Sequence, residues 1–452
     1  MNIPRTRLIL FGVIGGVVLL ILLVLFGVLP GLRGGNGVPP VGTDVTLEVW
    51  GVFDDEDVLV DSFDRAAAGA TIEYRRLDEA TYEEDLIAAF ASGKAPDVFM
   101  FHNSWLPKFV DKIVPAPETL VSTLDMDRFP TTVMQDFAPD GKVYALPLYL
   151  DTLALFYNKD IFDRAAIAGP PATWADFERI VPRLRTMTRN GDIERAAAAI
   201  GGSEASVNRA TDLLSLIMLQ TGTRMTDDDF TVATFDGSEG QDAFRFYLSF
   251  ANPAEREKYT WNDGLTYSLD AFAEEKVAVI FNYAHQLKAL RERSPFLRVG
   301  VAPVPQPSEA TDEVNYPNYW GFAVSSQSAH PDAAWNFIAN LTTDPDTMKL
   351  YLETAGRPPA LRTLIEEHIG NPDWDVFARQ ALSARSWPQV DNTEIERIFS
   401  EAIRNVLTGR FPPEVSLNRA KEEVNTLMER RAERSERTRP VEDGDGGIQI
   451  DF

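Results

Sequence analysis

The chain of 452 residues carries 43 Lys and Arg against 68 Asp and Glu, a formal net charge of −25, and contains no cysteine. This length allows two or three domains with separate cores, and the negative charge argues against a nucleic-acid partner, because phosphate binding depends on Lys and Arg. The lack of cysteine excludes thiol nucleophiles, disulfides, thiolate metal sites and a lipid-bearing N-terminal cysteine.

The N-terminal residues 1–33 are predicted to be a short cytoplasmic stub followed by a transmembrane signal anchor. Every residue in 8–29 is Leu, Ile, Val, Phe or Gly. At about 1.5 Å per residue such a helix spans roughly 33 Å, enough to cross the hydrocarbon core of a bilayer. Arg5 and Arg7 precede the apolar run and only Arg33 follows it, which places the body of the protein outside the cytoplasm.

Two further segments are predicted to lack regular structure. Residues 34–43 are rich in Gly and Pro and form a flexible linker, and residues 431–452 show no apolar period and form a disordered tail. A signal peptide cleaved between Gly34 and Gly37 is the alternative to an uncleaved anchor.

The segment after Asp44 alternates strands with helices. Thr81 and Glu84 have the spacing of a capping box at the start of the second helix, and Gly93 is a stop signal at its end. Three strands and two helices within about sixty residues predict an α/β layer with a parallel sheet. The expected elements are a strand that ends at Gly51, a helix over 58–68, a strand over 71–77, a helix over 81–91 and a strand over 97–101.

The rest of the chain continues with mixed elements and becomes helical towards its C-terminus. An apolar segment that starts at Val143 ends in the sequence YNKD, and Thr173 with Asp176 marks a capped helix start. We expect further helices over 208–221 and 240–250, a strand over 277–281, and helices after Pro331, over 393–407 and over 416–430.

The sequence signatures of common catalytic sites are missing. The chain contains no GxSxG, HExxH or GxxxxGK[ST] motif and no GxGxxG that opens a helix. Its four histidines, His102, His285, His330 and His368, are far apart, and we expect each to be a structural or surface residue. The sequence therefore predicts a protein that is not an enzyme and has no metal and no cofactor.

Aromatic, amide and carboxylate side chains follow the ends of five expected strands. Ligands of open α/β sheets bind beyond the carboxyl ends of the strands, where flat rings can stack on sugars while Asp and Asn bond hydroxyl groups. The alternative for each single residue is a place in the core or at its boundary. The candidate ligand-binding residues are Trp50, Phe53, Asp54, Asn103, Trp105, Tyr149, Asp151, Asn282, Tyr283, Tyr319 and Trp320.

Several segments in a fixed order carry a family resemblance. The most specific pair is YEEDLIAAFASGKAPDVFMFHNSWLPKF (82–109) followed by DGKVYALPLYLDTLALFYNKDIF (140–162). The chain resembles the extracellular solute-binding proteins of ABC importers, in the subfamily similar to maltose-binding protein. Further matching segments are LEVWGVFDDEDVLVDSF (47–63), PATWADFERIVPRL (171–184), FAEEKVAVIFNY (272–283), APVPQP (302–307), YWGFAVSSQSAHPDAAWNFIANLT (319–342) and AGRPPALRTL (355–364).

This resemblance implies an α/β fold of two periplasmic-binding-protein-like lobes, of type II, joined by hinge crossovers, with a solute in the cleft between them. Lobe I is expected to comprise 44–149 and 322–372, and lobe II 150–321 and 373–430. Where sugar-binding relatives carry an Asp-Arg pair after the third strand, this chain has Ser104-Trp105, which argues against a specificity like that for maltose.

The combined reading is a single-pass, membrane-tethered extracytoplasmic receptor that binds a small polar solute, a carbohydrate, and delivers it to the permease subunits of an ABC transporter. Asp151 and Asn103 are expected to bond the solute's hydroxyl groups, with Trp105, Tyr283 and Trp320 as stacking walls. The alternatives are a glycan-processing enzyme that uses the same cleft, and a ligand-sensing or adhesion receptor on the same fold.

Overall fold

The computed structural model describes residues 45–53 and 56–438. The expected membrane helix at 8–29, the linker at 34–43, the candidate residue Asp54 and the end of the expected tail lie outside the described residues. Within the described ranges, no helix is both long enough and apolar enough to cross a bilayer.

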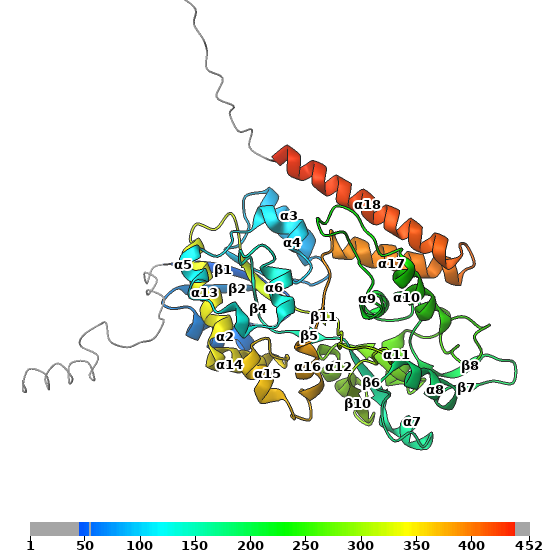
Figure 1. Cartoon of the computed structure of the whole chain (residues 1–452). Helices are drawn as coiled ribbons and strands as arrows, with labels where there is room; N and C mark the ends of the chain where they lie inside the picture. The colour runs from blue at the N-terminus through cyan, green and yellow to red at the C-terminus, as the bar shows by residue number, and fades with distance from the viewer. Residues whose placement is uncertain (1–44, 54–55, 439–452) are drawn as a thin grey trace, which may run out of the picture. The chain divides into compact units, whose positions relative to one another are not determined.

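Lobe I is built on a five-stranded sheet in the order β2-β1-β3-β12-β4 (Figure 1). Strand β1 pairs in parallel with β2 and β3, as the alternation of strands and helices predicts. Strand β12 runs antiparallel to β3 and β4, and Gly321 lets it approach β4, because a Cβ there would lie 2.2 Å from the carbonyl oxygen of Leu146. The strands are β1 (Thr46–Gly51), β2 (Thr71–Arg76), β3 (Val98–His102), β4 (Leu146–Pro147) and β12 (Trp320–Val324).

Helices from both ends of the chain cover the sheet of lobe I. Phe63 of α2 packs edge-on against Phe337 of α13 at 5.2 Å between ring centroids and against Phe322 of β12 at 6.0 Å. Aromatic packing therefore joins segments that are about 270 residues apart in sequence. The helices of this lobe are α2 (Glu56–Ala66), α3 (Tyr82–Ala91), α4 (Leu106–Phe109), α5 (Glu118–Val121), α6 (Thr131–Phe137), α13 (Pro331–Thr343), α14 (Pro345–Ala355) and α15 (Arg362–His368).

Lobe II contains a second five-stranded sheet in the order β10-β6-β9-β8-β7. One hydrophobic core cluster joins this sheet to its helices and reaches from Leu153 to Met428. The strands are β6 (Ala154–Asn158), β7 (Thr186–Met187), β8 (Ile193–Ala198), β9 (Val277–Asn282) and β10 (Val299–Ala302). The helices are α7 (Lys159–Arg164), α8 (Trp174–Leu184), α9 (Ala210–Gln220), α10 (Ser238–Ser249), α11 (Ser268–Ala273), α12 (His285–Arg293), α16 (Asp375–Ala381), α17 (Asn392–Leu407) and α18 (Pro413–Thr438).

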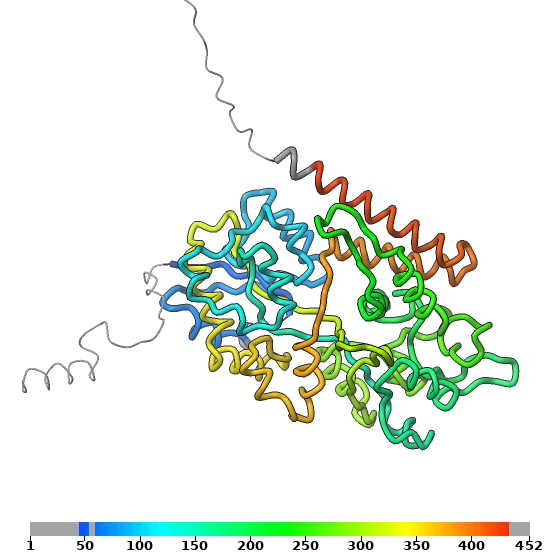
Figure 2. The backbone as a smooth tube through the Cα atoms, in the orientation of Figure 1, coloured from blue at the N-terminus to red at the C-terminus, as the bar shows by residue number. Residues whose placement is uncertain are grey.

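Three chain segments connect the lobes. Strand β5 (Asp151–Thr152) and strand β11 (Pro317–Asn318) form a two-stranded antiparallel sheet of their own. The third segment, residues 382–391, runs alongside them, with a bridge between Asn315 and Ala384, and appears in Figure 2 as the orange tube that leads from α16 to α17. The α/β architecture with two lobes and hinge crossovers is therefore present as expected.

Two local expectations need correction. Thr81 precedes α3 but makes no capping bond; its hydroxyl bonds Asp85 at 2.9 Å instead, because Thr81 has a helical backbone conformation that points Oγ1 away from the first free N–H groups. Helix α18 continues to Thr438, so residues 431–438 are helical rather than disordered; Arg, Glu and Ala extend a helix that packing has already nucleated. At Thr173 the expected cap is present, since its hydroxyl accepts from the N–H of Asp176.

Candidate ligand-binding cleft

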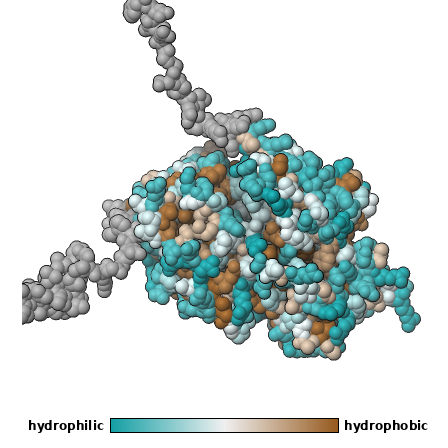
Figure 3. Space-filling model, viewed as in Figure 1, coloured by the Kyte–Doolittle hydropathy of each residue, from teal (hydrophilic) through white to brown (hydrophobic). Residues whose placement is uncertain are grey.

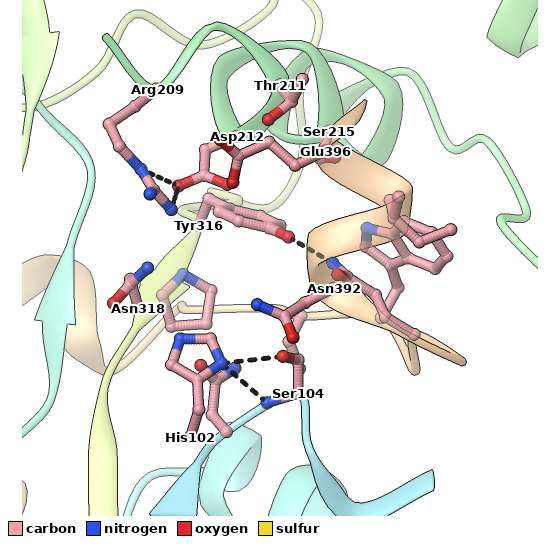
Figure 4. Close-up of a pocket in the computed structure, with 16 residues that line it drawn as sticks. His102, Ser104, Arg209, Thr211, Asp212, Ser215, Tyr316, Asn318, Asn392 and Glu396 are labelled. Atoms are coloured by element: carbon pink, nitrogen blue, oxygen red, sulfur yellow. Dashed lines mark hydrogen bonds and ion pairs between the residues drawn. The ribbon is translucent and has the colours of Figure 1, made fainter. Parts of the chain in front are cut away.

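A narrow cavity lies where the two lobes meet the hinge segments (Figure 4). Its volume is about 30 Å³, room for about two water molecules. It is lined by His102, Asn103 and Ser104 from lobe I; Arg209, Thr211, Asp212 and Ser215 from lobe II; Tyr316, Pro317, Asn318, Ser386, Trp387 and Gln389 from the crossovers; and Asn392, Ile395 and Glu396 from α17.

An ion pair forms the centre of the lobe II wall. Arg209 directly precedes α9, and its Nε and Nη2 atoms lie 2.7 and 2.5 Å from Oδ2 of Asp212. The same oxygen accepts from the hydroxyl of Tyr283 at 2.6 Å, and the guanidinium lies 5.5 Å from the centroid of the Tyr283 ring. Arg209 has a left-handed backbone conformation, φ 64°, which is costly for a residue with a Cβ. These contacts hold the arginine in place against that cost.

Two further carboxyl groups lie close to this ion pair. Oε1 of Glu204 accepts from the N–H and the hydroxyl of Thr211 at 2.8 and 2.9 Å. Burial and the nearby charge of Glu396 raise the pKa of Glu204 to about 7. Burial also raises the pKa of Glu396, although the charge of Arg209 opposes the shift. Arg209 therefore stands among three carboxyl groups, two of which have a raised pKa.

The lobe I wall is hydrogen-bonded and neutral. Burial and the charge of Arg209 lower the pKa of His102 to about 3, so the imidazole is uncharged. Its Nδ1 accepts from the N–H of Ser104 at 3.3 Å and lies 2.7 Å from the Ser104 hydroxyl, which places the ring proton on Nε2. We expected this histidine to be structural or at the surface, but it forms part of the cleft wall.

The third crossover and the first residue of α17 bring an indole ring and two amides to the cavity. Trp387 is 4% exposed and stacks on Phe399 at 6.1 Å, and its Nε1 has no hydrogen-bond partner among the described residues. Nε2 of Gln389 donates to the hydroxyl of Tyr316 at 3.1 Å. Oδ1 of Asn392 accepts from Nε1 of Trp105 at 3.1 Å, a bond that joins α17 to lobe I.

A buried carboxyl group links lobe I to two of the crossovers. Asp136 of α6 accepts from the hydroxyl of Tyr319 at 2.8 Å, from Nδ2 of Asn103 at 3.1 Å and from the hydroxyl of Ser386. Burial raises the pKa of Asp136 to about 6, although these hydrogen bonds favour its ionised form. The bond to Ser386 is the member of this network that reaches the third crossover, so it is the one that a movement of that crossover relative to lobe I would strain.

The predicted stacking residues of lobe I are packed against other rings of the same lobe. Trp105 lies parallel to Tyr82 and Phe109, at 6.0 and 4.9 Å between centroids, and meets Trp320 edge-on at 5.1 Å. Trp320 also meets Phe53 edge-on at 5.5 Å. Neither Trp105 nor Trp320 is among the residues that line the cavity, so both lie behind its wall.

Asp151 occupies a structural position at the first crossover. It is fully buried, and Oδ1 accepts from the N–H groups of Thr152 and Ala284 at 2.8 and 3.0 Å. Oδ2 accepts from the N–H of His285 at 3.3 Å, at the start of α12. A carboxylate at a helix N-terminus is stabilised by the free N–H groups there, so Asp151 fastens the crossover to lobe II.

The remaining predicted residues also make contacts inside the protein. Trp50 donates to Glu48, Asn282 donates to Asn208, and Tyr149 lies against the guanidinium of Arg357. Of the ten predicted residues that the structure describes, Asn103 lines the cavity, and Tyr283 reaches it through Asp212. Their roles as ligand contacts stay predictions.

Sequence reasoning missed the lobe II part of the cavity wall around Arg209 because it missed strand β8. The sequence IERAAA of β8 shows no clear alternation and has a single branched apolar residue, Ile193, yet it pairs in parallel with β9 inside the sheet. Had the strand been predicted, the search beyond strand ends would have led to the segment that contains Glu204, Arg209 and Asp212. The described ranges contain no group of three potential metal ligands.

The comparisons with known proteins agree with this architecture. The family model of a bacterial extracellular solute-binding protein matches residues 58–377. A putative binding protein of Brucella abortus is 21% identical over 375 residues, which cover 82% of this chain and 88% of that protein. The maltotriose-binding protein of Pyrococcus abyssi is 23% identical over 293 residues, 63% of this chain and 59% of that protein. The solved sugar-binding protein MalE from Xanthomonas citri shares the fold with a TM-score of 0.70 at 20% identity, covering 87% of this chain and 99% of that one.

Proposed function

Because the chain belongs to the family of bacterial extracellular solute-binding proteins, we propose that it is the receptor of an ABC importer and binds a carbohydrate in the cleft between its lobes. The family consists of binding proteins that are not enzymes, which agrees with the missing catalytic signatures. The curated relative from Pyrococcus abyssi, which binds maltotriose, supports a sugar as the solute.

The chemistry of the cavity wall is the observation that carries the proposal. Both lobes and the crossovers contribute hydroxyl and amide groups, and Trp387 adds an indole ring. A sugar offers many hydroxyl groups, which both donate and accept, together with apolar C–H faces that stack on aromatic rings. The ion pair of Arg209 and Asp212 supplies strong donors and acceptors without a net charge of its own.

Binding is expected to proceed through a change in the distance between the lobes. The walls come from different lobes, and three chain segments connect these lobes (Figure 1). A solute that contacts both walls stabilises the closed arrangement, because only that arrangement provides both sets of contacts.

We also propose that residues 8–29 tether the receptor to the cell membrane, with the lobes outside the cytoplasm. Support comes from the uninterrupted apolar run and from the arginines on its N-terminal side. The full chain should then remain in the membrane fraction after carbonate extraction. Recovery of a soluble species that starts near residue 34 would contradict the tether.

A thermal-shift screen tests the nature of the solute. At a concentration a hundred times its dissociation constant, a specific ligand stabilises the folded state by about 2.7 kcal/mol, and each kcal/mol raises the melting temperature by about 2–4 °C. Sugars or polyols should give the largest shifts. If only amino acids or peptides raise the melting temperature, the carbohydrate proposal is wrong.

A matched pair of tryptophan variants tests the position of the site. Trp387→Ala should weaken binding of the best sugar by about 2 kcal/mol, roughly thirtyfold, in calorimetric titrations. Trp374→Ala changes a half-buried tryptophan at the start of α16 that does not line the cavity, and its affinity should stay within about twofold. Equal affinities of the two variants would contradict this location.

A further inference from the structure

A short segment of lobe I is bonded to the C-terminal helices of lobe II, where α4 faces the start of α17 (Figure 1). Nε1 of Trp105 donates to Oδ1 of Asn392 at 3.1 Å, and Nζ of Lys108 lies 2.7 Å from Oδ2 of Asp391. From α18, Nε of Arg431 donates to a carbonyl oxygen of α4 at 2.7 Å. The six residues of these contacts, which we name the interlobe latch, are Trp105, Pro107, Lys108, Asp391, Asn392 and Arg431.

The lobe I side of the latch is held in place by its own lobe. The ring of Trp105 stacks on Phe109 at 4.9 Å between centroids, and Lys108 also pairs with Glu83. Although burial opposes the shift, bonds to Asp391 and Glu83 raise the pKa of Lys108, so its ammonium group stays charged. These contacts make the segment move with lobe I.

The lobe II side is anchored equally well. Oδ1 of Asp391 accepts from the N–H of Glu394 at 3.3 Å and caps α17, while Oδ2 faces Lys108. Helices α17 and α18 belong to the core cluster of lobe II, for example through Ile395 and Val424. The latch therefore connects two bodies that each have a core of their own.

The latch and the proposed solute site are separate sets of contacts. Of the six latch residues, Asn392 lines the cleft cavity and the other five do not. The ion pair of Lys108 and Asp391 and the bond from Arg431 can therefore persist when a solute is bound. Both sets of contacts stabilise the same closed arrangement of the lobes.

Two further cavities flank the latch. One of about 550 Å³ is lined by α4, the third crossover and α18, and one of about 280 Å³ is lined by α4, Asp391 and α18. Pro107 and Arg431 line both of them. The lobes can separate here without opening a tightly packed core, because the polar groups of the latch exchange their partners for water at a modest net cost.

We propose that the interlobe latch holds the two lobes together independently of the solute, and thereby sets the fraction of closed molecules in the free receptor. The apparent affinity of a receptor is its intrinsic affinity multiplied by the fraction of molecules that are competent to bind. The latch therefore scales the affinity for every solute by the same factor, whatever the chemistry of that solute.

Distance measurements by pulsed electron paramagnetic resonance test the proposal without any solute. Because the chain has no native cysteine, spin labels attach only at the engineered positions I87C on α3 and V415C on α18, which are 39% and 42% exposed. The parent chain should give mainly one short distance between the lobes. Lys108→Gln combined with Arg431→Gln should raise the fraction of longer distances about fivefold or more, because an ion pair and a hydrogen bond between the lobes are lost. Each single variant should give a smaller shift in the same direction.

Matched controls separate the latch from a general effect of lost charge. Lys258→Gln removes a lysine whose pair with Glu178, at 2.8 Å, lies within lobe II and is about as exposed as the pair of Lys108 and Asp391. This variant should leave the distances between the lobes unchanged. Labels at V60C on α2 and I87C, both in lobe I, should give the same distance in every variant if lobe I keeps its fold.

Three results would overturn the proposal. Mainly long distances in the parent chain would show that the lobes are not held together without a solute. Unchanged distances in the double variant would show that the latch does not hold them, and an equal shift in Lys258→Gln would show that any lost ion pair has this effect.

Discussion

The two lobes line their sides of the cleft with different kinds of side chain. In lobe I, an aromatic cluster of Phe53, Tyr82, Trp105, Phe109 and Trp320 packs behind the wall, and only the short polar segment 102–104 reaches the cavity. In lobe II, ionised and hydrogen-bonding groups on and before α9 line the cavity directly. An aromatic residue at a strand end can therefore serve as the support of a binding wall without being its surface.

The largest expected effect tests whether the aromatic cluster is structural. Trp320→Ala should lower the free energy of unfolding by about 3–5 kcal/mol in denaturant titrations, because it opens a large cavity among packed rings. Phe296→Ala is the control: Phe296 is 97% exposed, and its loss should cost less than about 0.5 kcal/mol. If Trp320→Ala keeps its stability but loses solute binding, Trp320 contacts the solute directly and does not merely support the wall.

A second variant tests the charged wall of lobe II. Asp212→Asn leaves the half-buried Arg209 without its closest carboxylate and weakens the bond from Tyr283, so the free energy of unfolding should fall by about 2–3 kcal/mol. Asp228→Asn removes a carboxylate that also pairs with an arginine, Arg224 at 2.7 Å, but is 94% exposed. This control should change stability by about 0.5 kcal/mol or less. Equal effects of the two variants would mean that the wall has no special electrostatic role.

The third expectation concerns pH and Asp136, the buried carboxyl group of lobe I that bonds Ser386 of the third crossover. The pKa of Asp136 in the folded protein is about 6 and exceeds its unfolded value of about 4, so the folded state binds this proton more tightly. The stability from this proton is fully present below about pH 4 and is lost as pH rises through about 6. Relative to the parent chain, Asp136→Asn should therefore become more stable by about 1–2 kcal/mol between pH 4 and pH 7.5.

Asp140 provides a control of opposite sign for the pH experiment. Although burial opposes the shift, bonds from Tyr144 and from the N–H of Lys142 lower the pKa of Asp140. Its contribution to stability is present above its unfolded pKa and is lost as pH falls, so the relative stability of Asp140→Asn should decrease with rising pH. The same trend in both variants would contradict the assigned roles.

The smallest expected effect concerns the bond from Trp105 of the lobe I aromatic cluster to Asn392 of α17 in lobe II. Trp105→Phe keeps an aromatic ring but removes the Nε1 donor to Asn392, which should cost about 1 kcal/mol and increase the radius of gyration in small-angle scattering. Trp50→Phe removes a comparable bond to Glu48 within lobe I. It should lower stability without any change in the radius of gyration, and a change in both variants would show that this bond does not set the distance between the lobes.

The sequence was sufficient for the fold where local patterns determine the structure. The elements between Val45 and His102 alternate as predicted, because buried strands and amphipathic helices differ clearly in apolar period. The site was harder to predict, since its wall depends on long-range packing: Arg209 follows a strand without a clear pattern, and Trp387 lies in a crossover without regular structure. Asp151 and Trp320 were predicted as ligand contacts from their places at the ends of strands. In the structure the carboxylate of Asp151 accepts backbone N–H groups, and the ring of Trp320 packs against Trp105.

The amino-acid composition also predicts how polar the surface is. The strongly acidic chain predicts a hydrophilic exterior, and the face in Figure 3 is mainly hydrophilic, with hydrophobic residues in separate patches. Phe296, the most exposed large apolar side chain among the described residues, lies three residues beyond the end of α12.

The small volume of the cleft cavity has a consequence for the speed of uptake. A cavity of about 30 Å³ is far below the roughly 300–1,000 Å³ of typical ligand pockets, so a solute of the size proposed here fits only after the lobes separate. The observed association rate is then the diffusional encounter rate multiplied by the fraction of open molecules. At high solute concentration this rate should reach a plateau set by the opening motion, on the microsecond-to-millisecond timescale of hinge movements. The interlobe contacts therefore limit the maximum rate of association.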